Sequence, residues 1–229
     1  MQESILVILE LDDIALETAG GKAMGLARLR ELGLPVPAAV VVPVDEPFDD
    51  TDAVVARLGE PLAVRSSAVG EDAADRSFAG QFETVLGVNR AGLAAAVAKV
   101  RGTTARAEAY GSAGPVAVVI QQEVQATRAG VAFSRDPISG ADEVFIECAL
   151  GGGEAVVSGT TTPDRYWVAG NRVKARAAGS LRTLRDDEAE RIAELVRAAE
   201  HGFDRPVDVE FCWEGHELWL VQCRPITTL

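Results

Sequence analysis

The residues best suited to chemistry lie near the end of the chain, in the segments DVEFCWE and LWLVQCR. Polar and apolar residues alternate there, which predicts two half-buried strands that place Asp208, Glu210, Gln222 and Arg224 on one polar face. Carboxylate and amide oxygens suit Mg²⁺, which usually takes one or two protein carboxylates together with substrate phosphates. The alternative is a sheet whose outer face is merely polar, with a surface ion pair between Asp208 and Arg224.

The register of this predicted hairpin follows from its apolar residues. Phe211 is expected opposite Val221, because a slip of one residue would turn one apolar set outward. The loop would then be Gly215-His216-Glu217, which is an acceptable three-residue hairpin connection. The same register pairs the four polar residues across the strands, Asp208 with Arg224 and Glu210 with Gln222.

Two segments in the first half are suited to binding phosphate. Gly20-Gly21-Lys22 precedes a predicted helix, and the N–H groups at a helix start together with a lysine favour an anion. Val64-Arg65-Ser66-Ser67 is expected to bring Arg65 to a strand end, followed by the small residues Ala79 and Gly80, whose backbone N–H groups suit phosphate oxygens. The alternatives are a turn with a solvated lysine and a polar loop with a rim arginine.

The elements that must position these residues form an α+β pattern with a strand-rich second half. Asp186–His201 is the clearest amphipathic helix, with Ile192, Leu195, Val196 and Ala199 facing inward. Asn89 is expected to cap a helix, and Gly170-Asn171 to turn a hairpin. Further helices are expected over residues 22–32 and 51–58, and strands over residues 5–11, 36–42, 62–65, 83–88, 116–124, 130–133, 143–148, 165–168, 172–177, 207–213 and 218–223.

Composition limits the class of protein. The chain has 229 residues, 48% hydrophobic residues and a formal net charge of −13, which are typical of a globular protein and argue against a general binder of nucleic acid or anionic membranes. Cys148, Cys212 and Cys223 lie far apart, which predicts buried free thiols and a cytoplasmic setting. His201 and His216 lack metal-ligand spacing and are expected on the surface. No leader or membrane span is expected.

Five ordered stretches resemble one family. They are GGKAMGLARLRELGLPVPAAVVV, LAVRSSAVGEDAADRSFAGQFETVLGV, AVVIQQEVQATRAGVAFSRDPISG, GGGEAVVSGTTTPDRYWV and DVEFCWEGHELWLVQCRPIT. They are similar to the N-terminal ATP-grasp domain of phosphoenolpyruvate synthase, pyruvate phosphate dikinase and rifampicin phosphotransferase. The resemblance implies an α+β ATP-grasp fold with the nucleotide between two lobes, residues 1–113 and 114–229.

The resemblance also implies roles for individual residues. In that family the corresponding residues hold the phosphates of ATP, bind the adenine through a Gln-x-x-Val hinge, and bind metal and phosphate through the closing hairpin. These roles fall on Lys22, Arg65, Gly80 and Thr84 for phosphate, on Gln121, Glu123 and Val124 in the hinge, and on Glu210, Gln222 and Arg224 for Mg²⁺ and phosphate. Lys22, Arg65 and Arg224 are the expected catalytic residues.

The implied function is transfer of a phosphoryl or pyrophosphoryl group from Mg²⁺-ATP to a histidine on a separate carrier domain, whose motif this sequence lacks. The sequence departs from the family in three places: Glu123 stands where methionine is usual, Gly152 replaces leucine, and Val44–Pro61 leaves room for only one short helix, which shortens the first lobe. A nucleotide-binding regulatory module and an ATP-grasp ligase acting on a small carboxylate are the alternatives.

Overall fold

The chain folds into two compact units. The computed structural model describes residues 9–44, 46–69, 84–109, 116–152, 162–179 and 182–226. The first unit comprises Met1–Ala27 and Pro37–Glu123, and the second comprises Arg28–Val36 and Val124–Leu229. Each unit is built around its own antiparallel sheet.

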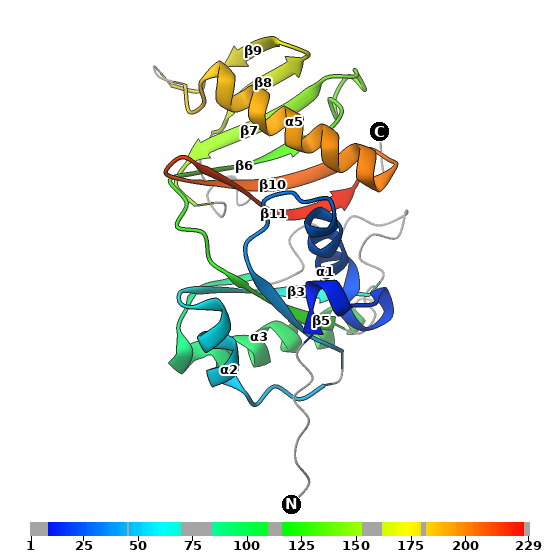
Figure 1. The fold of residues 1–229 in the computed structure, drawn as a ribbon, viewed down its shortest axis with the longest axis vertical. Helices are drawn as coiled ribbons and strands as arrows, with labels where there is room; N and C mark the ends of the chain where they lie inside the picture. Colours follow the sequence, from blue (N-terminus) through cyan, green and yellow to red (C-terminus); the bar gives the residue numbers. More distant parts are fainter. Residues whose placement is uncertain are drawn as a thin grey trace, which may run out of the picture. The chain divides into compact units, whose positions relative to one another are not determined.

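The first unit is a five-stranded sheet in the order β1-β2-β5-β3-β4, with its helices α2 and α3 packed on one face (Figure 1). Apolar residues from both helices and from four strands make one core there, with Leu93 and Ile120 fully buried. The elements are β1 (Leu9–Glu10), the 3₁₀ turn η1 (Leu11–Asp13), β2 (Ala39–Val42), α2 (Thr51–Leu58), β3 (Leu62–Ala68), β4 (Thr84–Val88), α3 (Arg90–Ala109) and β5 (Val116–Gln122).

The second unit is a six-stranded sheet in the order β11-β10-β6-β7-β8-β9, and α5 crosses one of its faces (Figure 1). Ile192, Val196 and Ala199 on α5 are fully buried against Tyr166 and Phe211 of the sheet. The elements are β6 (Arg128–Phe133), β7 (Val144–Leu150), β8 (Asp164–Ala169), β9 (Arg172–Arg176), α5 (Asp186–Phe203), β10 (Val207–Glu214) and β11 (Glu217–Pro225).

Local sequence signals account for several of these boundaries. The Asn89 side chain accepts a hydrogen bond from the Gly92 N–H at 3.0 Å, which confirms the predicted cap of α3. Gly170, with φ +59°, turns the β8–β9 hairpin at the predicted position, and α2 covers the predicted residues. The three cysteines are buried and form no disulfide bond with one another, as predicted. Residues 5–8 of the first predicted strand lie outside the described residues.

The helix α1 (Leu16–Glu31) begins earlier than the predicted start at Lys22. One extra turn precedes Gly20, whose φ of +74° and ψ of 173° interrupt the helix. The predicted stop at Gly33 is confirmed, because Gly33 has φ +70° and the following Leu34 N–H donates to the Leu29 carbonyl at 3.0 Å. This is the hydrogen bond expected where a glycine terminates a helix.

The division between the two units differs from the predicted boundary after residue 113. β5 pairs with both β2 and β3, so the first unit continues to Glu123. The segment Arg28–Val36 belongs to the second unit, because the Arg28 guanidinium donates to the Gly202 carbonyl and the Leu220 N–H donates to the Pro35 carbonyl at 2.8 Å. Sequence periodicity does not reveal such long-range hydrogen bonds.

Candidate functional site

One face of the first sheet carries three of the predicted site residues. Val64 and Ile120 point into the core beneath α2 and α3, and strand alternation therefore directs Arg65 and Gln121 to the opposite face. Thr84 on β4 lies directly across from Arg65, so its side chain shares that face. The structure thus brings Arg65, Thr84 and Gln121 together on one surface.

The helix that carries Lys22 is attached to the same strand. The helix resumes at Gly21 after the break at Gly20, and the Ala23 N–H donates to the Ser67 hydroxyl at 3.1 Å. Ser67 alternates with Arg65 on β3 and therefore lies on the same face. The peptide that holds Lys22 is thereby fixed beside the Arg65 strand, where the start of a helix provides N–H groups suited to an anion.

We expect Gly20→Ala to destabilise the protein strongly, because α1 approaches β3 too closely for a side chain. A Cβ atom at Gly20 would lie 2.4 Å from the Ser67 carbonyl oxygen and 2.7 Å from its hydroxyl. The backbone conformation, with φ +74° and ψ 173°, adds a cost of about 1–3 kcal/mol for any residue with a Cβ. Thermal and urea unfolding of the variant measure the total loss.

Gly59→Ala is the matched control for this prediction. Gly59 has φ +76°, yet a Cβ there would meet nothing within 4 Å among the described residues, so only the conformational cost applies. We expect Gly20→Ala to cost at least about 2 kcal/mol more than Gly59→Ala, since backbone atoms must move apart. Equal losses for the two variants would show that the close approach contributes nothing to stability.

The closing hairpin places the four polar residues as predicted. Asp208 pairs with Arg224, and Glu210 pairs with Gln222. Arg224 Nε donates to both Asp208 carboxylate oxygens, at 3.0 and 2.8 Å. Val209, between the two acidic residues, is buried in the core under α5, so strand alternation puts the polar residues on the other face of the sheet.

The predicted partner of Phe211 is wrong. Phe211 pairs with Leu220 instead of Val221, because the register shifts after Glu210 and leaves Val221 as an extra residue in β11. The shift is a β-bulge, which lets Leu220 join the core with Phe211 while Val221 turns to the other face. The loop is accordingly the two residues Gly215-His216, with φ +60° at Gly215.

The bulge creates an apolar surface next to the polar pairs. Ala129, Cys212 and Val221 form a small cluster, and Trp219 and Val124 pack against it. Cys212 alternates with Glu210 on β10, so this apolar surface continues the face that carries the polar residues. The buried apolar cluster and the polar pairs therefore lie side by side on this face of the sheet.

The predicted hinge residues Gln121, Glu123 and Val124 have different surroundings. The Gln121 side chain is 1% exposed, and its Nε2 atom has no hydrogen-bond partner in the part of the chain that the structure describes. The Glu123 carboxylate accepts a hydrogen bond from the Gly87 N–H of β4, whereas Val124 packs in the second unit. A buried amide donor without a partner costs about 1–3 kcal/mol.

The predicted residues are divided between the two units. Gly80 lies outside the described residues. Lys22, Arg65, Thr84, Gln121 and Glu123 belong to the first unit, and Val124, Glu210, Gln222 and Arg224 belong to the second.

Two residues that hold the predicted site residues in place, Ser67 and Gly87, were not among the predicted site residues. A serine at a strand end that faces a helix start, and a glycine inside the strand segment TVLGV, are the signals that mark them.

A family comparison matches most of the chain. Residues 48–180 and 170–229 match the family described as pyruvate phosphate dikinase, AMP/ATP-binding domain. The probable phosphoenolpyruvate synthase of Archaeoglobus fulgidus is 35% identical over 207 residues, which cover 73% of this chain and 27% of that protein. The rifampicin phosphotransferase of Streptomyces sviceus is 36% identical over 214 residues, covering 76% of this chain and 24% of its own length. The chain therefore spans about a quarter of these relatives.

Solved structures share the fold of this chain at low sequence identity. N5-carboxyaminoimidazole synthase from Aspergillus clavatus, in complex with ADP and 5-aminoimidazole ribonucleotide, aligns over 93% of this chain and 46% of its own, with a TM-score of 0.58 and 14% identity. At this identity the likeness concerns the fold. None of the helices in the described part of the chain is long and apolar enough to span a membrane.

Proposed function

Because this chain belongs to the pyruvate phosphate dikinase AMP/ATP-binding domain family, we propose that it binds Mg²⁺-ATP and transfers a phosphoryl or pyrophosphoryl group from it. Its fold is the α+β ATP-grasp fold. The observation that carries the proposal is the cross-strand pair Glu210–Gln222, which lies next to the Asp208–Arg224 ion pair on one side and the apolar cluster around Cys212 on the other.

The first unit would bind the phosphates. Arg65 and Thr84 lie opposite one another on the face of the sheet away from α2 and α3, and Lys22 stands at the helix start attached to Ser67. Two cations and a set of helix N–H groups favour a polyanion. Gly80 and Arg224 would complete this phosphate-binding set, and the residues Gln121–Val124 would line the adenine.

Glu210 and Gln222 fit a magnesium ion. Among the residues that the structure describes, no three His, Cys, Asp or Glu side chains gather into a metal site of their own. Mg²⁺ usually needs only one or two protein oxygen ligands and takes the rest from phosphate and water. When bound, the ion neutralises charge that develops on the phosphates. Glu210 would orient the nucleotide against Arg224, two residue pairs along the hairpin.

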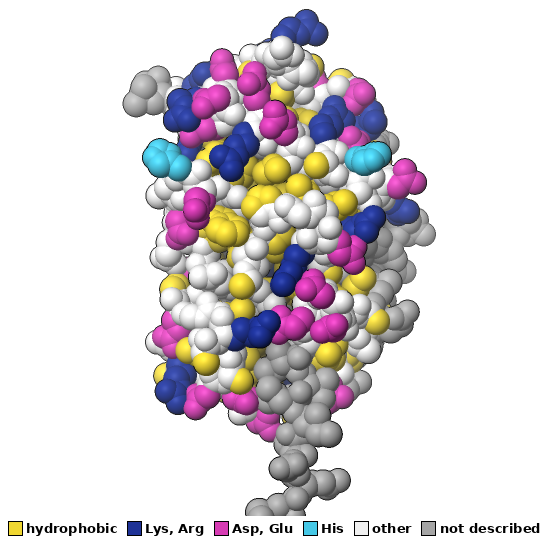
Figure 2. Space-filling model, in the orientation of Figure 1, with side chains coloured by type: hydrophobic (Ala, Val, Ile, Leu, Met, Phe, Trp, Pro, Cys, Tyr) yellow, Lys and Arg dark blue, Asp and Glu magenta, His cyan; other side chains and the backbone are white. Residues whose placement is uncertain are grey.

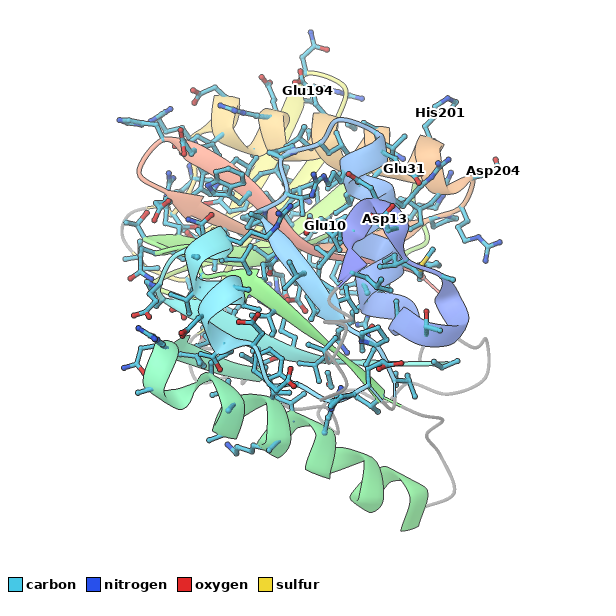
Figure 3. All side chains as sticks on the ribbon, turned by 60° about the horizontal axis from the view of Figure 1, so that its bottom comes forward. Glu10, Asp13, Glu31, Glu194, His201 and Asp204 are labelled. Atoms are coloured by element: carbon cyan, nitrogen blue, oxygen red, sulfur yellow. The ribbon has the colours of Figure 1, made fainter. Side chains whose placement is uncertain are left out.

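The acceptor that we propose is a histidine on a carrier region outside residues 1–229. Both histidines of this chain lie on the surface (Figure 2). His201 projects from the end of α5 (Figure 3), and His216 lies in the hairpin turn. His216 is six residues from Glu210, about 20 Å along a strand at roughly 3.4 Å per residue. Buried free thiols agree with the proposed cytoplasmic location.

The experiment combines calorimetry with identification of the nucleotide product. We expect the chain to bind ATP only weakly without Mg²⁺, and to show no stoichiometric acid-labile phosphorylation of its own histidines. AMP as product indicates the pyrophosphoryl route and ADP indicates simple phosphoryl transfer. Absence of binding at millimolar ATP and Mg²⁺ contradicts the proposed function, and rapid phosphorylation of His201 or His216 contradicts the separate carrier.

A further inference from the structure

Glu123 makes contacts with two strands of the first unit. Its backbone N–H donates to the Pro61 carbonyl at 3.0 Å, immediately before β3. Its carboxylate accepts a hydrogen bond from the Gly87 N–H on β4. The end of the hinge is therefore connected by its backbone to the start of β3 and by its side chain to β4.

A bulge in β4 makes the Gly87 N–H available. Leu62 pairs with Val88 and Val64 pairs with Val85, so two residues of β4 stand opposite Ala63. Gly87 has φ +66°, which is typical of a glycine in such a bulge. β4 is also the edge strand of its sheet, and a strand bonded on one side is held less firmly than a central strand.

The contact lies close to a phosphate-binding residue. Thr84 begins β4, three residues before Gly87, and faces Arg65. A carboxylate that holds Gly87 in place therefore limits how far Thr84 can move relative to the hinge. Methionine, which the resembling family usually has at this position, cannot accept this hydrogen bond, since its thioether is a weak acceptor.

We propose that Glu123 is a positioning residue that ties the adenine hinge to β4 and thereby fixes Thr84 for the phosphates of ATP. This inference rests on the proposed function. The affinity for a ligand that contacts both the hinge and Thr84 depends on the distance between them. The affinity for a ligand that contacts only the hinge does not depend on this distance, so Glu123 strengthens binding of ATP selectively over adenosine.

The test compares Glu123→Met with Glu123→Gln. Glu123→Met should bind ATP about threefold to tenfold more weakly, the size expected for the net contribution of one typical hydrogen bond, with a smaller change in adenosine affinity. Glu123→Gln keeps an acceptor oxygen and should restore most of the loss. Hydrogen exchange at the Gly87 amide should accelerate in the methionine variant and stay slow in the glutamine variant.

Glu60→Met provides the matched control. The Glu60 carboxylate also accepts from a backbone N–H, that of Arg90 at the start of α3, at 2.9 Å. Loss of this hydrogen bond in Glu60→Met should lower stability to a similar degree and leave the ratio of ATP to adenosine affinity unchanged. Thr84→Val offers a second control, because Glu123→Met should weaken ATP binding less once Thr84 no longer contributes.

The outcomes separate this inference from the proposed function. Wild-type protein that fails to bind ATP overturns the proposed function, and the inference with it. Two results overturn only the role of Glu123, provided that the wild-type protein binds ATP. Either Glu123→Met binds ATP as tightly as the wild type, or it loses affinity for ATP and for adenosine equally. Unchanged exchange at Gly87 in Glu123→Met also overturns that role.

Discussion

Glu210→Gln is expected to lower metal-dependent turnover by more than about a hundredfold, the size that loss of a metal-held transition-state interaction produces. The substitution removes a negative charge and keeps the shape of the side chain. Glu210 is half-buried on the polar face of the hairpin, whereas the core beneath α5 is made by its neighbours Val209 and Phe211. Folding should therefore change little.

The measurement is a titration of activity with Mg²⁺ and ATP, together with a thermal melt. The metal concentration for half-maximal activity should rise in Glu210→Gln, and the melting temperature should stay within a few degrees of wild type. Glu217→Gln makes the same chemical change at an exposed position in the same hairpin and should leave both quantities unchanged. A Glu210→Gln protein that unfolds while keeping normal activity per folded molecule would contradict the assignment.

Strand alternation predicted the polar pairs of this hairpin but missed its bulge. The pairs Asp208–Arg224 and Glu210–Gln222 lie before the register shift, so an ideal hairpin and the real one agree there. Beyond the shift, Leu220 and Cys223 both reach the core although they are an odd number of residues apart. Alternation cannot describe such a change of face, because it depends on how the strand fits α5 and β6.

The residues of the first unit that were predicted to bind phosphate show the same limit at longer range. Gly20-Gly21 before a helix was predicted as a phosphate-binding turn, which stays a prediction. Arg65 was predicted at the end of a strand, but β3 continues to Ala68 and Arg65 lies in its middle. The contact that joins them, from Ala23 to Ser67, spans 44 residues. The Glu123–Gly87 contact spans 36 residues, and the sequence suggested only that the Glu123 position is unusual. Local patterns identify the residues, and tertiary packing decides which of them meet.

A second strong effect is expected at a buried ion pair in the second unit. Arg128 on β6 donates two hydrogen bonds to the Glu188 carboxylate on α5, at 2.8 and 3.0 Å. Their side chains are 16% and 6% exposed. Arg128 also donates to the Thr183 carbonyl and lies over the Trp213 ring, 5.0 Å from its centroid. The pair joins α5 to the sheet that carries the β10–β11 hairpin.

The protonation of Glu188 should make this contribution depend on pH. Burial alone would raise its pKa, but the hydrogen bonds from Arg128 and from the Arg185 backbone N–H outweigh burial and hold the pKa below its usual value. A carboxyl group whose pKa is lowered on folding stabilises the protein above its unfolded pKa, which is about 4.3 for glutamate. That stabilisation is lost as the pH falls through the lower, folded pKa.

Arg128→Met is therefore expected to destabilise the protein by about 3–5 kcal/mol at neutral pH, because it leaves the Glu188 charge buried without its main partner. The double variant Arg128→Met/Glu188→Leu should be more stable than Arg128→Met alone, since it removes the unpaired charge. Arg197→Met is the control: Arg197 is 35% exposed and its partner Asp142 is 68% exposed, while its other partner Glu200 keeps contacts with Arg135 and Ser134, so its loss should cost less than about 1 kcal/mol. Urea unfolding from pH 7 down to pH 3 should show the difference between wild type and Arg128→Met shrinking as Glu188 becomes protonated. A difference that stays constant over this range, or a double variant no more stable than Arg128→Met, would show that the packing of Arg128 against Trp213, and not its charge, holds α5 in place.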